Sequence, residues 1–342
     1  MRTVDLRSDT VTLPTKEMLD AILVAKLGDD IHEEDETVKK LEELAAQRLG
    51  KEAGLMVPSG TMGNLLSILT HTGRGNEVIA GKSSHVFLYE VGGMASIAGA
   101  QARTVDDSPG FMKPADIKAA IRPDDIHHPK IALLCLENTH NMAGGTCLTP
   151  DQMSEYREIA DSANLKLHVD GARIFNSAIA QGIAASKLAR EADSVMFCLS
   201  KGLSAPIGSM LVGSEDFIGQ ARKNRKMLGG GMRQAGIIAA PGIIALNSMV
   251  DRLVEDHKNA RLLAEGLSKM PGIIIDLAKV QTNIVRFDID VKIDGPIFID
   301  KLAQRGIKAF CLPGYGIRMV THRHVSEDDI HFTLAAMEQM MK

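Results

Sequence analysis

Apolar and polar positions alternate in blocks through the middle of the chain, from about residue 58 to residue 245. Short apolar runs predict strands at 77–80, 102–105, 131–137, 165–170 and 194–199. Amphipathic stretches between these runs predict helices at 61–72, near 91–97, and at 114–121, 150–163 and 186–189. This order is typical of a doubly wound, mostly parallel sheet with helices on both faces. Ligands of such sheets bind beyond the carboxyl ends of the strands.

The two flanking regions have their own patterns. Before the alternating region, helices are expected at 16–25 and 37–49. After it, one or two long helices at 241–267 lead into strands at 272–276, 282–287 and 316–320, with helices at 296–305 and 327–341. Because 342 residues are many for a single core, we expect more than one domain. The expected organisation is an N-terminal segment that lines the active site (1–50), a large α/β domain (51–245) and a smaller α+β domain (246–342).

Composition narrows the class of protein. Hydrophobic residues make up 45% and charged residues 24% of the chain, which is ordinary for a soluble globular protein and excludes a disordered chain or a fibre. The net charge of −4 disfavours nucleic acid as a partner. No apolar run approaches the about 20 residues of a membrane span, and residues 1–5 lack the apolar core of a signal peptide. We therefore expect a cytoplasmic protein that has no membrane partner.

Cysteine and histidine spacing gives no sign of a metal centre. The four cysteines are far apart in the sequence and form no CxxC pair, so we expect reduced thiols, at positions 135, 147, 198 and 311. The eleven histidines show no HExxH motif or other paired metal spacing. No metal ligand is assigned.

Two apolar runs end in residues that carry chemistry. The run from Ser194 ends at Lys201, and the run from Leu165 ends at Asp170. If the two strands are parallel neighbours, both residues reach the same carboxyl edge of the sheet. A lone lysine is more often a solvated surface residue. Pyridoxal phosphate, however, needs a lysine amine for its aldehyde and a carboxylate that keeps its ring nitrogen protonated, and this pair would supply both.

A third stretch could bind the phosphate of this cofactor. Small residues precede the helix predicted at 61–72, in the sequence Pro58-Ser59-Gly60-Thr61-Met62-Gly63-Asn64. The first turn of a helix offers free N–H groups to an anion. We assign Ser59, Gly60 and Thr61 to a phosphate cup. Ser200, next to Lys201, either joins this cup or only caps its loop.

Six motifs in this order resemble the L-threonine aldolase family of fold-type I pyridoxal phosphate enzymes. They are found at 5–12, 58–64, 137–141, 168–173, 200–203 and 229–234. The resemblance implies a transferase-like fold with pyridoxal 5'-phosphate as cofactor. It also implies cleavage of a small β-hydroxy amino acid, such as L-threonine or L-allo-threonine, to glycine and an aldehyde. Dimers or tetramers whose subunits share active sites are typical of the family.

The resemblance assigns further residues to the site. Ser8, Arg173 and Arg318 would bind the substrate carboxylate, and Arg173 would also contact the cofactor. Arg233 would reach the phosphate of a neighbouring subunit's cofactor.

Two histidines and a glutamate are the candidates for proton transfer. His85 would stack on the cofactor ring and can also act on the substrate hydroxyl. The family pattern Ile-His-x-Pro gives His127 an active-site role and leaves His128 as the variable position, although adjacent histidines can exchange in such a match. Glu90 would orient or assist the base.

One loop departs from the family pattern. Threonine aldolases typically have an aromatic residue and then Gly-Glu-Asp-Pro, whereas this chain has His32-Glu33-Glu34-Asp35-Glu36. Losing both the glycine and the proline is expected to change the path of the loop.

Two other functions remain open at this stage. A related pyridoxal phosphate lyase, acting on phenylserine or by β-elimination, would use the same scaffold. A non-catalytic binding protein on the same fold would be expected to lack Lys201 or Asp170, and both are present.

Overall fold

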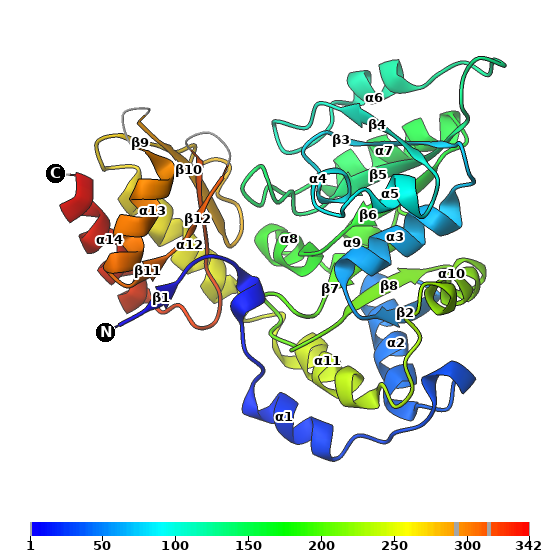
Figure 1. Cartoon of the computed structure of the whole chain (residues 1–342), viewed down its shortest axis with the longest axis horizontal. Coiled ribbons are helices and arrows are strands. Elements are labelled where there is room, and N and C mark those ends of the chain that lie inside the picture. The colour runs from blue at the N-terminus through cyan, green and yellow to red at the C-terminus, as the bar shows by residue number, and fades with distance from the viewer. Residues whose placement is uncertain (1, 291–293, 313–315, 342) are drawn as a thin grey trace.

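A seven-stranded sheet forms the centre of the larger lobe in this computed structural model, which describes residues 2–290, 294–312 and 316–341. Figure 1 shows the sheet on the right of the view. Its strand order is β2 (Ala53–Val57), β8 (Ser209–Gly213), β7 (Ser194–Cys198), β6 (Lys166–Asp170), β5 (Ile131–Glu137), β3 (Glu77–Gly81) and β4 (Gln101–Val105). β8 runs antiparallel to both of its neighbours, and the other strands run the same way. The prediction of a mostly parallel sheet is confirmed.

Successive side chains of the large sheet point to opposite faces and pack against different helices. On β7, Met196 and Cys198 pack with α3 (Gly60–His71) and α10 (Glu215–Met227). Val195 and Phe197 point to the other face, in the main core. That face is covered by α2 (Glu36–Leu49), α7 (Pro150–Ser162), α8 (Ile174–Gln181) and α9 (Ala185–Ala189). Because helices cover both faces, side chains of either orientation are buried on the central strands.

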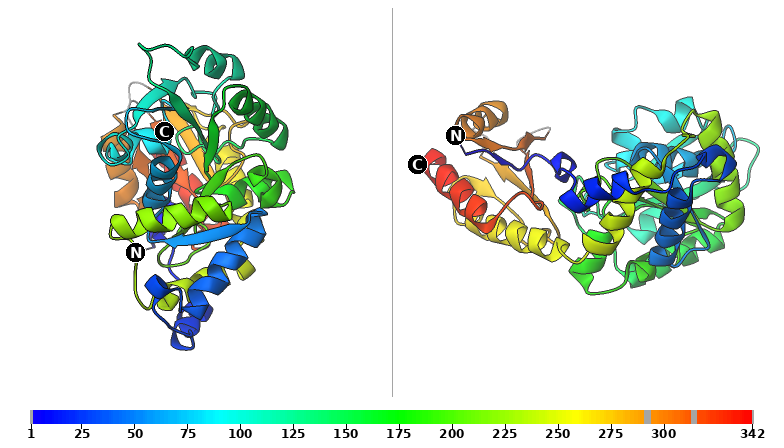
Figure 2. Two further views of the ribbon diagram at one scale, coloured as in Figure 1. Left: turned by 90° about the vertical axis from the view of Figure 1, so that its right-hand side faces the viewer. Right: turned by 90° about the horizontal axis from the view of Figure 1, so that it is seen from below.

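In the part of the chain that the structure describes, the smaller lobe has a four-stranded antiparallel sheet and three helices. The strand order is β12 (Phe310–Cys311), β13 (Gly316–Val320), β10 (Ile284–Ile289) and β9 (Ile273–Ile274). The helices are α12 (Leu253–Leu267), α13 (Gly295–Gln304) and α14 (Glu327–Met341). Figure 2 shows this lobe beside the larger one, with the N-terminal strand next to the C-terminal helix.

The N-terminal segment belongs to both lobes. β1 (Val4–Asp5) pairs in parallel with β11 (Ile307–Lys308), and Val4 and Leu6 are buried in the core of the smaller lobe. A short 3-10 helix, η1 (Asp9–Val11), and α1 (Lys16–Leu23) then continue the chain along the larger lobe, where α1 packs against α11 (Gly236–Ser248). The first dozen residues therefore connect the two lobes.

The boundary between the two cores lies inside α12. Leu253, at its start, packs into the main core, whereas Ala260 and Leu263 pack into the core of the smaller lobe. The sequence-based boundary at 245/246 falls before this point. Because α12 carries apolar residues for both cores, hydrophobic pattern alone does not locate the change.

Several elements were not expected from the sequence. These are β2 and β8 at one edge of the large sheet, the helices α4 (His85–Leu88), α8 and α10, and the short strands β1, β11 and β12. α11 begins five residues before Pro241, where the predicted helix began. Of the helices in the described residues, none is by itself long and apolar enough to cross a membrane; α11 and α12 meet that test only together, with a 70° bend between them.

Candidate active site

β6 and β7 bring Asp170 and Lys201 to the same edge of the sheet. The strands are parallel, with Asp170 opposite Met196, and the N–H of Gly171 donates to the carbonyl of Met196 at 2.8 Å. Lys201 follows three residues after the end of β7. Its carbonyl accepts hydrogen bonds from the Thr12 hydroxyl (2.8 Å) and from the N–H of Ser204 (2.9 Å). The N-terminal segment thus fixes the lysine loop against the sheet.

Asn64 links the two buried carboxylates at this edge. Its amide nitrogen donates to Oδ2 of Asp170 and to Oε1 of Glu90, each at 2.8 Å. Asp170 also accepts a hydrogen bond from the N–H of Ala172 at 3.1 Å. Two negative groups in a dry site repel each other, so a shared donor between them stabilises both.

His85 lies beside the same pair of carboxylates, at the start of α4. Its Nδ1 is 2.9 Å from Oε1 of Glu90, and its side chain is 32% exposed. Burial alone would lower the pKa of His85, but the hydrogen bond to Glu90 and the charges of Asp170 and Glu90 raise it above the ordinary value. Because Nδ1 donates to Glu90, Nε2 is the ring nitrogen that remains for a substrate.

Glu137, the last residue of β5, fixes the main chain of His85 by a hydrogen bond. The N–H of His85 donates to Oε2 of Glu137 at 2.7 Å, and the N–H of Asn141 donates to Oε1 at 2.8 Å. Burial raises the pKa of Glu137, and the charge of Asp170 raises it further. One carboxylate therefore sets the positions of two loops that border the site.

The start of α3 has the form expected for a phosphate cup. Ser59 caps the helix, and its hydroxyl accepts from the N–H of Met62 at 3.2 Å. Among the described residues, the N–H groups of Gly60 and Thr61 have no hydrogen-bond partner. A Cβ on Gly60 would come within 2.9 Å of Sγ of Cys198, so this turn lies closely on β7. Ser200, which directly precedes Lys201, is half-buried.

On the side of the smaller lobe, Arg318 has an unsatisfied donor. Its Nη1 donates to Oδ1 of Asn141 at 2.9 Å, and its Nη2 lies 3.4 Å from the carbonyl of Arg7. Nε is buried and has no partner among the described residues. Burial and the neighbouring charge of Arg173 lower the pKa of Arg318. A bound carboxylate would supply both the missing acceptor and the missing charge.

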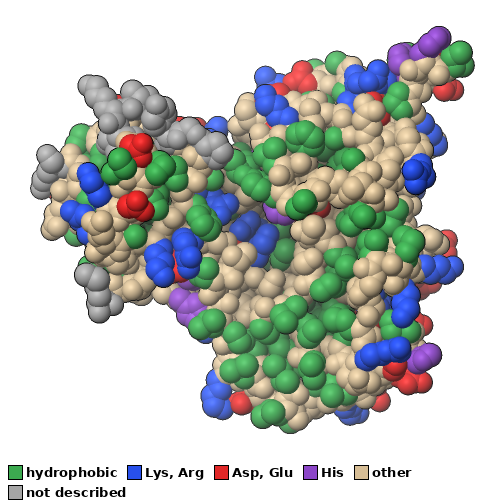
Figure 3. Space-filling model, viewed as in Figure 1, with side chains coloured by type: hydrophobic (Ala, Val, Ile, Leu, Met, Phe, Trp, Pro, Cys, Tyr) green, Lys and Arg blue, Asp and Glu red, His purple; other side chains and the backbone are tan. Residues whose placement is uncertain are grey.

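Ser8 is buried at the start of η1, one residue after the carbonyl that Arg318 approaches. Its hydroxyl oxygen accepts from the N–H of Thr10 (3.2 Å) and from the Thr10 hydroxyl (2.9 Å). Ser8 therefore follows directly on the carbonyl group that Arg318 approaches, and its role in a joint carboxylate site stays a prediction. Figure 3 shows a hollow between the two lobes with Lys or Arg side chains inside it.

Arg173 forms an ion pair with Asp9, which was not predicted from the sequence. Its Nε and Nη2 donate to the two carboxylate oxygens of Asp9, at 2.8 and 2.7 Å, and both side chains are buried. Asp9 therefore occupies the edge of the guanidinium formed by Nε and Nη2. The edge formed by Nη1 and the second N–H of Nη2 is left for a substrate or for the cofactor, so the role expected of Arg173 stays a prediction.

Two predicted residues are not assembled with the others within one chain. His127 lies in the loop 121–130 between α6 (Pro114–Ala120) and β5, which projects from the larger lobe (Figure 1). Its side chain is 80% exposed, and its Nδ1 contacts Asp125 at 2.6 Å. Arg233 is 60% exposed and pairs with Asp29 at 2.7 Å. The structure does not bring His127 to the site of its own chain. Arg233 was expected in the site of a neighbouring subunit, and that role stays a prediction.

The unusual loop at 32–36 keeps a regular geometry without glycine or proline. Glu33 adopts the left-handed conformation with φ of 56°, at the position where the family pattern has glycine. Asp35 caps α2, accepting from the N–H groups of Thr37 and Val38, so the helix starts at Glu36, where the pattern has proline. The expected change of path is not needed to accommodate these residues.

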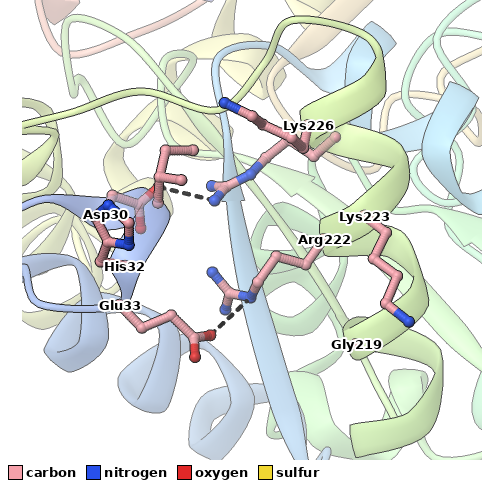
Figure 4. A pocket seen from close by; sticks show the side chains of 9 residues that line it. Asp30, His32, Glu33, Gly219, Arg222, Lys223 and Lys226 are labelled. Atoms are coloured by element: carbon pink, nitrogen blue, oxygen red, sulfur yellow. Dashed lines mark hydrogen bonds and ion pairs between the residues drawn. The ribbon is translucent and has the colours of Figure 1, made fainter.

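This loop forms one wall of a cavity of about 450 Å³ that is also lined by residues of α10. Figure 4 shows Asp30, His32 and Glu33 on one side, facing Arg222, Lys223 and Lys226 of α10. Arg222 pairs with Glu33 at 3.2 Å and with Glu42 at 2.7 Å. The carbonyl of Arg233 accepts from the N–H of Asp30 at 3.0 Å, so the loop that carries Arg233 borders this wall.

Sequence reasoning gave no role to Asp9, Asn64, Glu137, Asn141 or His168. Each of them lies inside one of the six motifs, so the motifs contained the signal. What the sequence lacked was the pairing, because Asp9 and Arg173 are 164 positions apart and Asn64 and Asp170 are 106 apart.

Comparison with known proteins gives the family. The model of the beta-eliminating lyase family matches residues 5–290. Low-specificity L-threonine aldolase 1 of Arabidopsis thaliana is 45% identical over 347 residues, which cover 100% of this chain and 97% of that protein. The low specificity L-threonine aldolase of Escherichia coli strain K12 is 42% identical over 328 residues, which cover 96% of each chain.

Solved structures agree on the fold. The threonine aldolase of Leishmania major superposes with a TM-score of 0.85 at 17% identity, covering 99% of both chains. A serine palmitoyltransferase of Sphingomonas wittichii superposes with a TM-score of 0.79 at 16% identity, covering 98% of this chain and 86% of that one. The expected fold-type I architecture is thereby confirmed. With a family model matching most of its length and relatives above 40% identity from end to end, this chain belongs to the pyridoxal-phosphate-dependent beta-eliminating lyase and threonine aldolase family.

Proposed function

We propose that this chain cleaves L-threonine and L-allo-threonine, and other β-hydroxy-α-amino acids, to glycine and an aldehyde. The observation that carries the proposal is the position of His85. It lies against Glu90 beside Asp170 at the carboxyl edge of the sheet, with Nε2 turned away from its carboxylate partner. Aldol cleavage needs such a base near the substrate hydroxyl.

The residues present fit pyridoxal phosphate. Lys201 would bind its aldehyde, Asp170 would contact its ring nitrogen, and the ring of His85 would stack on it. Ser59 and the free N–H groups of Gly60 and Thr61 would bind its phosphate at the helix start. When bound, the cofactor supplies a protonated ring that accepts the electron pair of the broken Cα–Cβ bond.

The chain's own contribution begins with orientation of the substrate. Arg318 offers its unsatisfied Nε to the substrate carboxylate, and Ser8 lies beside it. Nη1 of Arg173 could join them. By holding the carboxylate, these residues would set the orientation of the substrate and so select which bond at Cα is cleaved.

Proton transfer is assigned to His85. Its Nε2 removes the proton of the β-hydroxyl as the Cα–Cβ bond breaks and the hydroxyl carbon becomes an aldehyde. Glu90, hydrogen-bonded to Nδ1, stabilises the positive ring that results. The same proton is then available for return to Cα, which leaves glycine.

Assembly of several chains would complete the site. Arg233 and His127 are exposed and lie outside their own chain's site. We propose that in a dimer or tetramer each of them reaches the site of another subunit. Ile126, beside His127, is 96% exposed, which is consistent with a loop tip that is covered on assembly.

The experiment is an assay of glycine and acetaldehyde from L-threonine, with the visible absorption of bound pyridoxal phosphate recorded in parallel. Lys201→Ala should abolish both the lysine-linked absorption and the cleavage. A protein that stays colourless with added cofactor, or that is coloured but releases no glycine, would overturn the proposal.

The family match favours one second candidate, β-elimination, because the matching model is named for it. That reaction releases ammonia and a keto acid without glycine, so the same assay separates the two. Threonine, phenylserine and tryptophan as substrates would also separate the related lyases. The non-catalytic alternative is contradicted by the full-length similarity to enzymes of this family.

A further inference from the structure

A continuous row of buried polar groups crosses the sheet behind the two carboxylates. Nε2 of His71 lies 2.9 Å from the Ser194 hydroxyl, which lies 2.9 Å from Nδ1 of His168. Nε2 of His168 lies 3.0 Å from Oδ1 of Asn64. Asn64, His168 and Ser194 are each 0% exposed. The row ends at Asp170, through the amide nitrogen of Asn64.

All donors in this row point toward the carboxylates. Asn64 gives both of its N–H bonds to Asp170 and Glu90, so its oxygen must face His168. Nε2 of His168 must then carry hydrogen, and Nδ1 must accept the hydrogen of the Ser194 hydroxyl. The direction of each bond follows from the previous one.

Both histidines of the row are neutral. Burial lowers the pKa of His168 to about 4 and that of His71 to about 3. His71 stacks on Phe217, with ring centroids 4.4 Å apart, and donates from Nε2 to Ser194. A neutral imidazole donates from one nitrogen and accepts at the other, as the row requires at His168.

The opposite direction would change the charge of the site. If Nδ1 of His168 carried the hydrogen, Nε2 would accept, and the amide of Asn64 would have to turn over. Its oxygen would then face Oδ2 of Asp170 and Oε1 of Glu90, and both carboxyl groups would need protons. The row does not conduct protons, because the amide of Asn64 interrupts it. Its effect is on orientation and charge.

We propose that His168, fixed by Ser194, is a positioning residue that orients Asn64 so that both N–H groups of its amide face Asp170 and Glu90. Asn64 then holds the Asp170 carboxyl group where it would meet the ring nitrogen of pyridoxal phosphate, and holds Glu90 against His85. The role given to Asp170 rests on the proposed function. The direction of the row does not.

Two substitutions at one position separate this role from simple packing. His168→Leu fills the space but removes the donor to Asn64. His168→Gln keeps an N–H near the place of Nε2. His257→Leu is the matched control, because His257 is a half-buried histidine whose pKa burial lowers to about 4 and which lies 3.2 Å from an asparagine, Asn176, but outside the row. Far-UV circular dichroism and thermal unfolding establish that each variant is folded.

The first measurement is the dissociation constant of pyridoxal phosphate, titrated by absorption from pH 6 to pH 9. Losing a hydrogen bond that orients a charged group corresponds to roughly a tenfold change. His168→Leu should bind about tenfold more weakly, whereas His168→Gln and His257→Leu should stay within about threefold of the unaltered protein. Equal affinity of all four proteins would overturn the inference.

The second measurement needs no cofactor. The ¹⁵N spectrum of histidine-labelled protein without pyridoxal phosphate should show His168 with hydrogen on Nε2, and Ser194→Ala should produce a mixture of both tautomers. Hydrogen on Nδ1 in the unaltered protein would overturn the inference. If the protein bound no cofactor, the proposed function would fail and this spectrum would still decide. If it cleaved threonine while the position 168 variants behaved like it, only the inference would fail.

Discussion

Asp9 and Arg173 form a buried, two-bond ion pair that joins the N-terminal segment to the loop after β6. The distances are 2.8 and 2.7 Å, and Asn283 of the smaller lobe donates to the same carboxylate at 3.1 Å. Asp9→Asn would leave Arg173 as an uncompensated buried charge. We expect a loss of about 3 kcal/mol in the free energy of unfolding, measured by urea denaturation. Asp20→Asn, which removes an exposed pair with Lys16, is the control and should change stability little.

The same pair predicts a dependence of stability on pH. Burial alone would raise the pKa of Asp9, but the charges of Arg173 and Lys201 hold it well below the ordinary range. A lowered pKa in the folded state stabilises the protein above the unfolded value of about 4, and this contribution is lost as the pH falls below it. Urea midpoints from pH 6 to pH 2 should fall more steeply for the unaltered protein than for Asp9→Asn. Parallel curves would contradict the assignment.

Arg318 should control substrate affinity. Arg318→Lys removes the planar donor set, including the unsatisfied Nε, while keeping a positive charge. We expect KM for L-threonine to rise about tenfold or more, with a smaller change in kcat. Arg286, its partner across the strand pair, is the matched control, because it donates to the carbonyl of Met142 at 2.6 Å and is exposed. If Arg286→Lys raised KM as much as Arg318→Lys, the carboxylate site would have to be moved.

The hydrogen bond between His85 and Glu90 predicts how kcat/KM falls at acid pH. His85 must be neutral to accept a proton, so kcat/KM should fall as the pH drops through its pKa. The hydrogen bond to Glu90 raises that pKa. Glu90→Gln removes the charge, so the acid limb should move to lower pH, with a reduced maximum rate. The measurement is kcat/KM against pH, and a limb that stays in place would show that another group is the base.

The left-handed conformation of Glu33 predicts that glycine at this position stabilises the protein. Glu33 has φ of 56°, which costs a residue with a side chain about 1 kcal/mol. Its pair with Arg222 is 60% exposed on the glutamate side and contributes little. Glu33→Gly should raise the free energy of unfolding by about 0.5 to 1 kcal/mol. Asn164, with φ of 53°, is the control, and Asn164→Gly should gain less because asparagine tolerates this conformation.

Shared active sites predict complementation between two inactive chains. Lys201→Ala destroys its own site but still offers Arg233 to a partner, and Arg233→Ala does the reverse. If the two form random dimers, half are mixed and each mixed dimer has one intact site, so about one quarter of the activity should return. The readout is acetaldehyde release after the two variants are unfolded and refolded together. Activity no higher than the separate chains would place Arg233 outside the neighbour's site.

The sequence was sufficient for the centre of the molecule. β6 and β7 were correctly placed in a mostly parallel sheet, because short strand-forming runs alternate with helical stretches in this part of the chain. β2 and β8 were not predicted, although they are equally apolar. β2 pairs with β8, about 150 residues later in the chain, so that no local pattern in the sequence indicates the pair.

The site was only partly predictable for a related reason. Residue type told us that Arg173 could bind a carboxylate, but not that Asp9 of this chain already does so. Exposure could not be foreseen either: a motif match gives His127 a place in the sequence pattern, whereas its position on a projecting loop depends on how residues 121–130 leave the sheet. Long-range contacts decide both cases.

The pairing of the first residues with the last strands also has a consequence for synthesis of the chain. Val4 pairs with Ile307, and the carbonyl of Leu6 accepts from the N–H of Val320. During translation the N-terminal segment leaves the ribosome first, yet its partners appear about 300 residues later, which at typical rates takes tens of seconds. Over that time Val4 and Leu6 have no core to enter. Arg7 therefore comes within reach of Arg318 only when almost the whole protein has been made.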